Sequence, residues 1–345
     1  MSGGRKRAVL ICPGRGTYNA PELGYVTRHA TDPDMLARFD KMRSAAGQET
    51  LTALDTAPRY SAKRHATGDN ASALIFAAAV GDWQALDSDR VELVAVTGNS
   101  MGWYTALACA GAVDVTTGFD IANTMGRLMH AGAPGGQIVY PHMGDAWQPD
   151  PAEKARLLSL VAEIDARPDH RLALSIDLGG MLVIAGDAAG LTAFEQAVPK
   201  RDRFPMRLAH HAAFHTDMMR DVSEQGLSRF ASDRFHGPAV PLIDGRGQVW
   251  WPHATDPEAL RQYTLGTQVT ETYDFTHTIR IAAREFAPDV FILAGPCTTL
   301  GGAVAQSLIL ANWRGLSSKS AFQTAQEQAP FLVAMGRDDQ RALVT

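Results

Sequence analysis

A serine between two glycines is the feature of this chain with the clearest chemical potential. Residues 98–102 read Gly-Asn-Ser-Met-Gly, after an apolar run over residues 91–96 and before alanine-rich residues 103–112. The run predicts a strand and the following stretch a helix. Glycines allow a sharp strand-to-helix turn that exposes the serine oxygen. We therefore predict that Ser100 is a nucleophile and that the Met101 N–H at the helix start is an oxyanion donor. The alternative is a glycine-rich turn with a helix-capping serine.

A serine hydroxyl needs a base, and the chain has 11 histidines. Their spacing alone places none of them beside Ser100. His210, His211 and His215 lie together, but no Cys or carboxylate stands at ligand spacing, so we expect no metal site.

The bulk composition is that of a globular α/β protein. Of the 345 residues, 46% are hydrophobic and 20% charged, and the net charge is −5. We therefore expect no nucleic-acid or membrane partner. The three cysteines show no close pairing, and no apolar run has membrane-span length or the form of a signal peptide. These features predict a cytoplasmic protein with reduced thiols.

Strand and helix patterns alternate in the first and last thirds, which favours a parallel sheet. In the middle of the chain, the order of strand and helix patterns changes after the glycine- and proline-rich residues 132–136. There the patterns follow the order β-α-β-β-α-β, which is ferredoxin-like. The sequence thus predicts an α/β fold with a large α/β-hydrolase-like lobe, residues 1–133 and 207–345, and an inserted ferredoxin-like subdomain, residues 134–206.

Four segments in the same order resemble the malonyl-CoA:acyl-carrier-protein transacylase family, which includes the acyltransferase domains of fatty-acid and polyketide synthases. Residues 12–16 (Cys-Pro-Gly-Arg-Gly) are similar to its F-P-G-Q-G, and residues 98–106 to its G-H-S-x-G-E-Y-x-A. Residues 126–129 (Gly-Arg-Leu-Met) are similar to its R-x-x-x-M/R-L-M segment, and residues 213–219 to its A-F-H-S-x-x-M. The resemblance spans nearly the whole chain.

The resemblance implies a role for each matching residue. Ser100 would attack an acyl-CoA thioester, and His215 would take its proton and relay it later to the phosphopantetheine thiol of an acyl carrier protein. The backbone N–H groups of Arg15 and Met101 would bind the oxyanion. A backbone carbonyl at Gln268 would orient the histidine.

The same resemblance implies malonyl-CoA as the substrate, with no permanently bound cofactor. Arg127 would hold the malonyl carboxylate with its fork of donors, and without the resemblance it would be taken for a surface helix arginine. Phe214 before the histidine matches the malonyl-selecting form of the motif.

Several pocket positions depart from the family pattern. Arg15 replaces a glutamine, Asn99 a histidine, and Ala71 a glutamine that often lines the pocket. Trp103 and Cys297 replace a glutamate and a glycine. These changes leave the acyl group open, as well as the choice between fatty-acid and polyketide synthesis.

Three other functions compete with malonyl transfer. An α/β-hydrolase esterase shares the G-x-S-x-G pattern, but its histidine usually lies near the chain end. An acyl-hydrolase of the same fold would release acyl groups from a carrier protein, and Arg127 argues against it. A non-catalytic docking module would not need Ser100 and His215 together.

Overall fold

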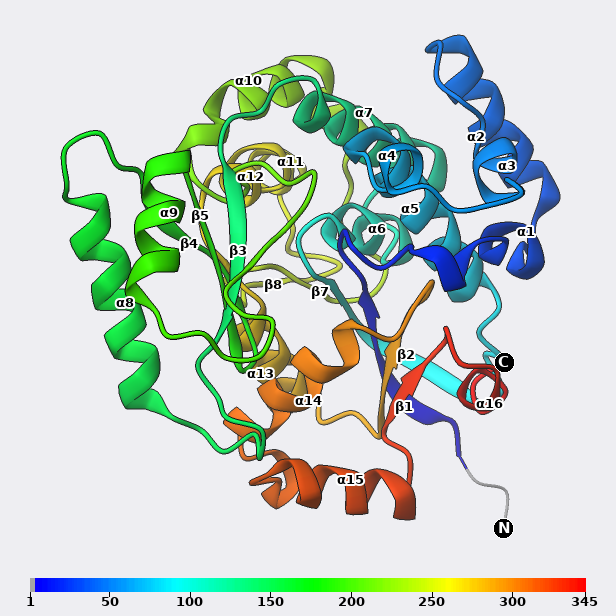
Figure 1. The fold of residues 1–345 in the computed structure, drawn as a ribbon. Coiled ribbons are helices and arrows are strands. Elements are labelled where there is room, and N and C mark those ends of the chain that lie inside the picture. Colours follow the sequence, from blue (N-terminus) through cyan, green and yellow to red (C-terminus); the bar gives the residue numbers. More distant parts are fainter. Residues whose placement is uncertain (1–3) are drawn as a thin grey trace.

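The computed structural model describes residues 4–345, which form two sheets with helices packed around them (Figure 1). The larger sheet has the strand order β11-β10-β1-β2-β7-β8. Neighbouring strands are parallel except for the antiparallel pair β7 and β8. The strands are β1 Lys6–Cys12, β2 Val91–Gly98, β7 Leu242–Ile243, β8 Val249–Trp250, β10 Val290–Leu293 and β11 Leu332–Ala334.

The central strands β1 and β2 are buried because helices cover the larger sheet. Residues 8–12 of β1 are fully buried, as a near-continuous apolar run in a parallel sheet requires. Among the helices, α5 and α7 pack against each other, and α6 lies against β1 and β2. The helices of this part are α1 Tyr25–His29, α2 Pro33–Ala45, α3 Leu51–Asp55, α4 Ala62–His65, α5 Gly68–Gln84, α6 Gly102–Cys109, α7 Val115–His130, α10 Arg220–Arg229, α11 Pro257–Gln262, α12 Gln268–Thr270, α13 Phe275–Glu285, α14 Leu300–Leu310, α15 Lys319–Gln328 and α16 Asp338–Arg341.

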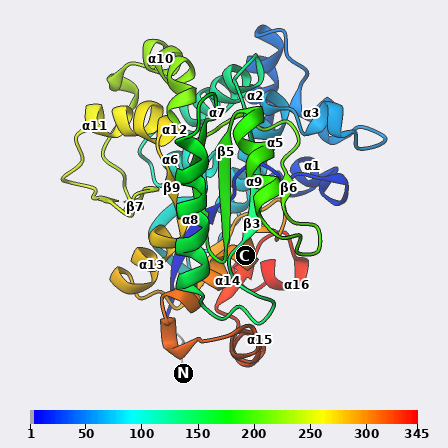
Figure 2. The ribbon, with the colours of Figure 1, turned by 60° about the vertical axis from the view of Figure 1, so that its left-hand side comes forward.

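The smaller sheet has the strand order β6-β3-β5-β4-β9. Two helices, α8 Pro151–Asp165 and α9 Ala188–Ala197, pack on it, as Figure 2 shows with both helices in front of the sheet. Along the chain the order is β3-α8-β4-β5-α9-β6, the ferredoxin-like order expected from the sequence. The strands are β3 Gly136–Pro141, β4 Leu172–Leu178, β5 Met181–Gly186, β6 Met206–Arg207 and β9 Tyr273–Asp274.

The two faces of the smaller sheet have different partners because successive side chains of a strand point to opposite sides. Ile138 and Ile184 belong to a separate small core beneath α8 and α9. Val139 and Val183, one residue away, belong to the large core instead. The second face therefore turns an apolar surface toward the larger sheet.

Strand β9 joins the smaller sheet from outside residues 134–206. It pairs in parallel with β4, and Tyr273 donates its hydroxyl to the carbonyl oxygen of Gly98, at 2.7 Å. The expected α/β class with a large and a small sheet is confirmed, whereas the domain limits drawn from the sequence stay a prediction. None of the helices within residues 4–345 has the length and apolar character to cross a membrane.

Candidate active site

Ser100 lies in a tight turn between β2 and α6, and its backbone adopts φ = 55°. This left-handed conformation is uncommon for a residue with a side chain and is often found at functional sites. The flanking glycines are sterically required. A Cβ at Gly98 would lie 2.3 Å from the Gly102 carbonyl, and a Cβ at Gly102 would lie 2.1 Å from the Cys12 oxygen.

His215 is in hydrogen-bonding contact with this serine. Its Nε2 lies 2.7 Å from Ser100 Oγ, and its Nδ1 lies 2.6 Å from the backbone carbonyl oxygen of Gln268. A carbonyl oxygen can only accept, so Nδ1 carries the proton and donates it. Nε2 is left as the acceptor for the serine hydroxyl. The three residues expected to form the nucleophile, its base and the orienting carbonyl are thus together.

Burial sets the protonation state of this histidine. The ring is almost completely buried, which lowers the pKa of His215 to about 4, although the hydrogen bond to the Gln268 carbonyl opposes the shift. His215 is therefore neutral at pH 7 and has a free lone pair on Nε2. A neutral imidazole next to a serine hydroxyl can act as its general base.

The side chain of Gln268 also holds the turn in place. Its Nε2 donates to the carbonyl oxygen of Ser100 at 3.0 Å, and its Oε1 accepts from the Tyr104 hydroxyl at 3.3 Å. Gln268 thus contacts both the serine backbone and, through its own carbonyl, the histidine. This double contact fixes the two reacting groups relative to each other.

Two backbone N–H groups near Ser100 are unpaired. Within residues 4–345, neither Met101 nor Arg15 donates its backbone N–H to a protein acceptor. The loop after β1 lies close to the turn, since a Cβ at Gly14 would be 2.6 Å from the Asn99 carbonyl oxygen. Unpaired donors beside a nucleophile are suited to binding an oxyanion, and that role for both residues stays a prediction.

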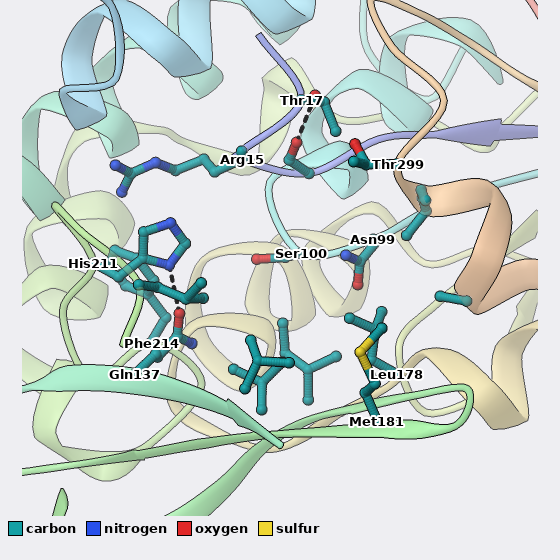
Figure 3. A pocket seen from close by; sticks show the side chains of 18 residues that line it. Arg15, Thr17, Asn99, Ser100, Gln137, Leu178, Met181, His211, Phe214 and Thr299 are labelled. Carbon is teal, nitrogen blue, oxygen red and sulfur yellow. Dashed lines mark hydrogen bonds between the residues drawn. The ribbon is translucent and has the colours of Figure 1, made fainter. Parts of the chain in front are cut away.

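The serine opens into a cleft between the larger sheet and the apolar face of the smaller one (Figure 3). The cleft has a volume of about 220 Å³. A second space of about 20 Å³ lies behind Ser100, enough for one water molecule. The cleft is lined by Gly14, Arg15, Gly16, Thr17, Asn99, Ser100, Gln137, Val139, Ile176, Leu178, Met181, Val183, Leu208, His211, Phe214, Thr299, Leu300 and Ala303.

The structure argues against the role expected of Arg127. This residue is exposed on α7 and lines neither the cleft nor the small space, whereas Gly126 and Met129 of the same helix do line the small space. Each helical residue turns by about 100°, so Arg127 points well away from the side that carries Gly126 and Met129. In this structure its guanidinium therefore lies outside both spaces next to Ser100.

Arg15 brings a guanidinium to the site instead. It lines both spaces, and in Figure 3 its side chain extends over the cleft into which Ser100 also points. Its Nη2 donates to the carbonyl oxygens of Ala66 (3.1 Å) and His210 (2.8 Å). Desolvation lowers the pKa of Arg15 to about 10, so the group remains charged at neutral pH.

Of the other pocket residues expected from the sequence, two line the spaces next to Ser100 and one does not. Asn99 lines the cleft, and Phe214 lines both spaces and lies 5.4 Å below the Arg15 guanidinium. Ala71 is buried in α5 but lines neither space. Its neighbour Ser72 lines the small one, with a hydroxyl that has no partner within the described residues.

Sequence reasoning missed a chain of polar contacts that supports the histidine loop. His211 Nδ1 bonds to Gln137 Oε1 (2.6 Å), and Gln137 Nε2 donates to Ser175 Oγ (2.6 Å). Ser175 in turn donates to the Phe214 carbonyl oxygen (2.7 Å), next to His215. These residues come from β3, β4 and a loop, so no local sequence pattern connects them.

Sequence comparison finds distant relatives of this chain among known proteins. No family model matches the chain. A malonyl CoA-acyl carrier protein transacylase from Salmonella typhimurium is 21% identical over 329 residues, which are 93% of this chain and 99% of that protein. The polyketide synthase GfsA from Streptomyces halstedii is 24% identical over 262 residues, which are 75% of this chain and only 3% of that much longer protein.

Among solved structures, a malonyl-CoA:acyl carrier protein transacylase from Xanthomonas oryzae matches with a TM-score of 0.75. The match covers 99% of this chain and 98% of that one, at 20% identity. The chain has the fold of the malonyl-CoA:acyl-carrier-protein transacylases. The resemblance to this family expected from the ordered motifs is confirmed, and it extends over both sheets of the transacylase fold.

Proposed function

We propose that the chain is a serine acyltransferase that moves a malonyl group from coenzyme A to the phosphopantetheine thiol of an acyl carrier protein. The observation that carries this proposal is the hydrogen-bonded series from Ser100 through His215 to the Gln268 carbonyl at the cleft. The substrate and the acceptor follow the names of the transacylases that the chain resembles from end to end.

In the first half-reaction, Ser100 Oγ attacks the thioester carbonyl carbon while its proton passes to His215 Nε2. The carbonyl oxygen becomes negative and lies toward the N–H groups of Arg15 and Met101. The C–S bond then breaks, and the leaving thiolate takes the proton from His215. The products are an acyl-serine ester and free coenzyme A.

The second half-reaction reverses these steps with a different thiol. The carrier-protein thiol gives its proton to His215 and attacks the ester carbonyl, and Ser100 recovers its proton as the C–O bond breaks. The apolar floor of the cleft, which includes Val139, Ile176 and Val183, suits the aliphatic parts of a pantetheine arm.

The experiment that tests this proposal follows the acyl group. Intact-protein mass spectrometry with malonyl-CoA should show one added malonyl group, and Ser100→Ala should show none. His215→Ala should slow acylation by about 10²–10⁴-fold, the usual contribution of a general base. Wild-type protein that gains no acyl group would contradict the proposal.

The acceptor is tested by adding a phosphopantetheinylated acyl carrier protein to the acylated enzyme. Radiolabelled malonyl should appear on the carrier protein. Release mainly as free malonate would instead identify an acyl-hydrolase, a reading that the exposed position of Arg127 no longer opposes.

A further inference from the structure

Among the described residues 4–345 that line the cleft and the small space behind Ser100, Arg15 is the one with a formal charge. No Asp or Glu in that part of the chain lines either space. The two lining histidines are neutral, because burial lowers the pKa of His215, and burial together with the Arg15 charge lowers that of His211. The cavity is thus a mostly apolar space that carries a single positive charge.

Most donors of this guanidinium are unused. Nη2 donates its two N–H groups to backbone carbonyls. Nε is buried with no acceptor, and Nη1 donates to no acceptor within residues 4–345. Burying a donor without a partner, and a charge without a counter-charge, costs free energy that a bound anion would recover. Asp69 is the carboxylate whose field reaches Arg15, but the two form no ion pair in the described part of the chain.

The position of Arg15 relative to the nucleophile adds a second constraint. It follows β1 in the loop whose backbone lies against the turn of Ser100, and its side chain is kept over the cleft by the Phe214 ring and the two carbonyls. Because Arg15 and Ser100 line the same two spaces, a group bound to the free donors of Arg15 would lie in the cavity into which Ser100 opens.

We infer that Arg15, and not Arg127, binds the terminal carboxylate of the acyl group and so selects a carboxyacyl substrate such as malonyl over a neutral one such as acetyl. This inference rests on the proposed function, because it names the group that recognises the acyl chain at that site. The planar fork of a guanidinium can donate two parallel hydrogen bonds to a carboxylate.

The test measures binding separately from chemistry. Ser100→Ala protein cannot be acylated, so calorimetric titration gives its affinity for malonyl-CoA, acetyl-CoA and coenzyme A. We expect malonyl-CoA to bind roughly 10- to 100-fold more tightly than acetyl-CoA, as expected for charge-assisted hydrogen bonds. Adding Arg15→Gln, which keeps the backbone N–H and a polar side chain, should abolish this preference and leave the affinity for coenzyme A unchanged.

Two further variants serve as controls. Arg15→Lys keeps the charge without the fork and should retain part of the preference. Arg127→Ala should retain all of it, because that side chain lies outside both spaces. In single-turnover acylation of proteins with Ser100 intact, Arg15→Gln should slow malonyl loading and spare acetyl loading.

Several results would overturn the inference. They are an unchanged preference in Arg15→Gln, an equal loss of affinity for all three ligands, no preference in the Ser100→Ala parent, or a preference lost in Arg127→Ala. A preference that depends on Arg15 in a protein that never acylates Ser100 would support the inference while contradicting the proposed transfer. The two failures are therefore distinguishable.

Discussion

Burial lowers the pKa of both His215 and Arg15, yet the two residues end in different charge states at neutral pH. His215 starts from an ordinary pKa near neutrality, so the shift to about 4 makes it neutral. Arg15 starts so high that a pKa of about 10 still leaves it protonated. One cleft thus holds a neutral base and a fixed cation, which suit attack on a thioester whose acyl group carries a negative charge.

The lowered pKa of His215 predicts how acylation depends on pH. Because Nε2 stays unprotonated down to about pH 4, the single-turnover acylation rate should be flat from pH 8 to about pH 5.5. Rapid-quench mass spectrometry with malonyl-CoA would measure it, with circular dichroism confirming that the protein stays folded. A rate that falls with an apparent pKa near 6.5 would show that the histidine is not desolvated as the structure has it.

The same shift affects folding. The unfolded chain binds a proton at this histidine at higher pH than the folded protein does. Stability from this group is therefore complete above the unfolded pKa and is lost as pH falls toward 4.

At the scale of elements, the turn between β2 and α6 depends on how closely α6 approaches β1. Gly102→Ala would place a methyl group 2.1 Å from the Cys12 carbonyl oxygen, and a backbone atom cannot move aside as a side-chain end can. We expect a loss of about 3 kcal/mol in unfolding free energy and a loss of acylation, since the displaced helix carries Ser100 away from His215. Urea denaturation and the acylation assay would measure both.

Gly302→Ala in α14 is the matched control. A Cβ there meets nothing within 4 Å, so the change should leave acylation intact and stabilise the helix by about 0.5–1 kcal/mol. Equal effects of the two substitutions would mean that the close approach at Gly102 is not what holds the turn.

Elements also show what the sequence can and cannot predict. Ser100 and His215 lie in motifs tied to a turn, and the structure brings their side chains within 2.7 Å of each other. Arg127 lies within a helix, where an offset of two residues rotates a side chain by about 200°, so a loose motif match does not tell which face it occupies. Strands β8 and β9 have two residues each and leave no periodic pattern to detect.

The cleft itself is harder to predict because it is built from distant segments. His211, Gln137 and Thr299 line it together, but they come from a loop, from β3 and from the residue just before α14. Arg15 was expected to act through its backbone. The role of its side chain depends on the groups that surround it in the folded protein. These groups cannot be identified from a sequence pattern.

At the scale of the whole molecule, a buried ion pair fastens the end of the chain to the helical layer. Asp82 of α5 is fully buried and bonds to Arg341 of α16, to the Tyr25 hydroxyl (2.8 Å) and to the Gly295 N–H (2.6 Å). These three partners come from three separate parts of the chain. Removing the carboxylate would leave the arginine without its counter-charge in the interior.

We predict that Asp82→Ala lowers the unfolding free energy by about 3–5 kcal/mol, the usual cost of breaking a buried pair at one partner. Chemical denaturation would measure this. Asp339→Ala is the control, because Asp339 pairs with Arg337 at the surface, where solvent screens the interaction, and it should leave stability nearly unchanged. A similar small effect for Asp82→Ala would mean that the C-terminal segment is not held by this contact.

Tyr273 has a consequence for how substrates enter. It belongs to the smaller sheet, yet its hydroxyl bonds to Gly98 at the base of the serine turn, and its ring lies 5.5 Å from that of His215. Moving the smaller sheet away from the serine turn would have to break this bond or separate β9 from β4. We therefore expect the cleft between the two sheets to keep the same width throughout the reaction. The long, thin pantetheine arm of a thioester must then enter a cleft of fixed width. Selection among acyl groups would depend on the fixed shape and charge of the residues that line the cleft, and not on closure of the two sheets around the substrate.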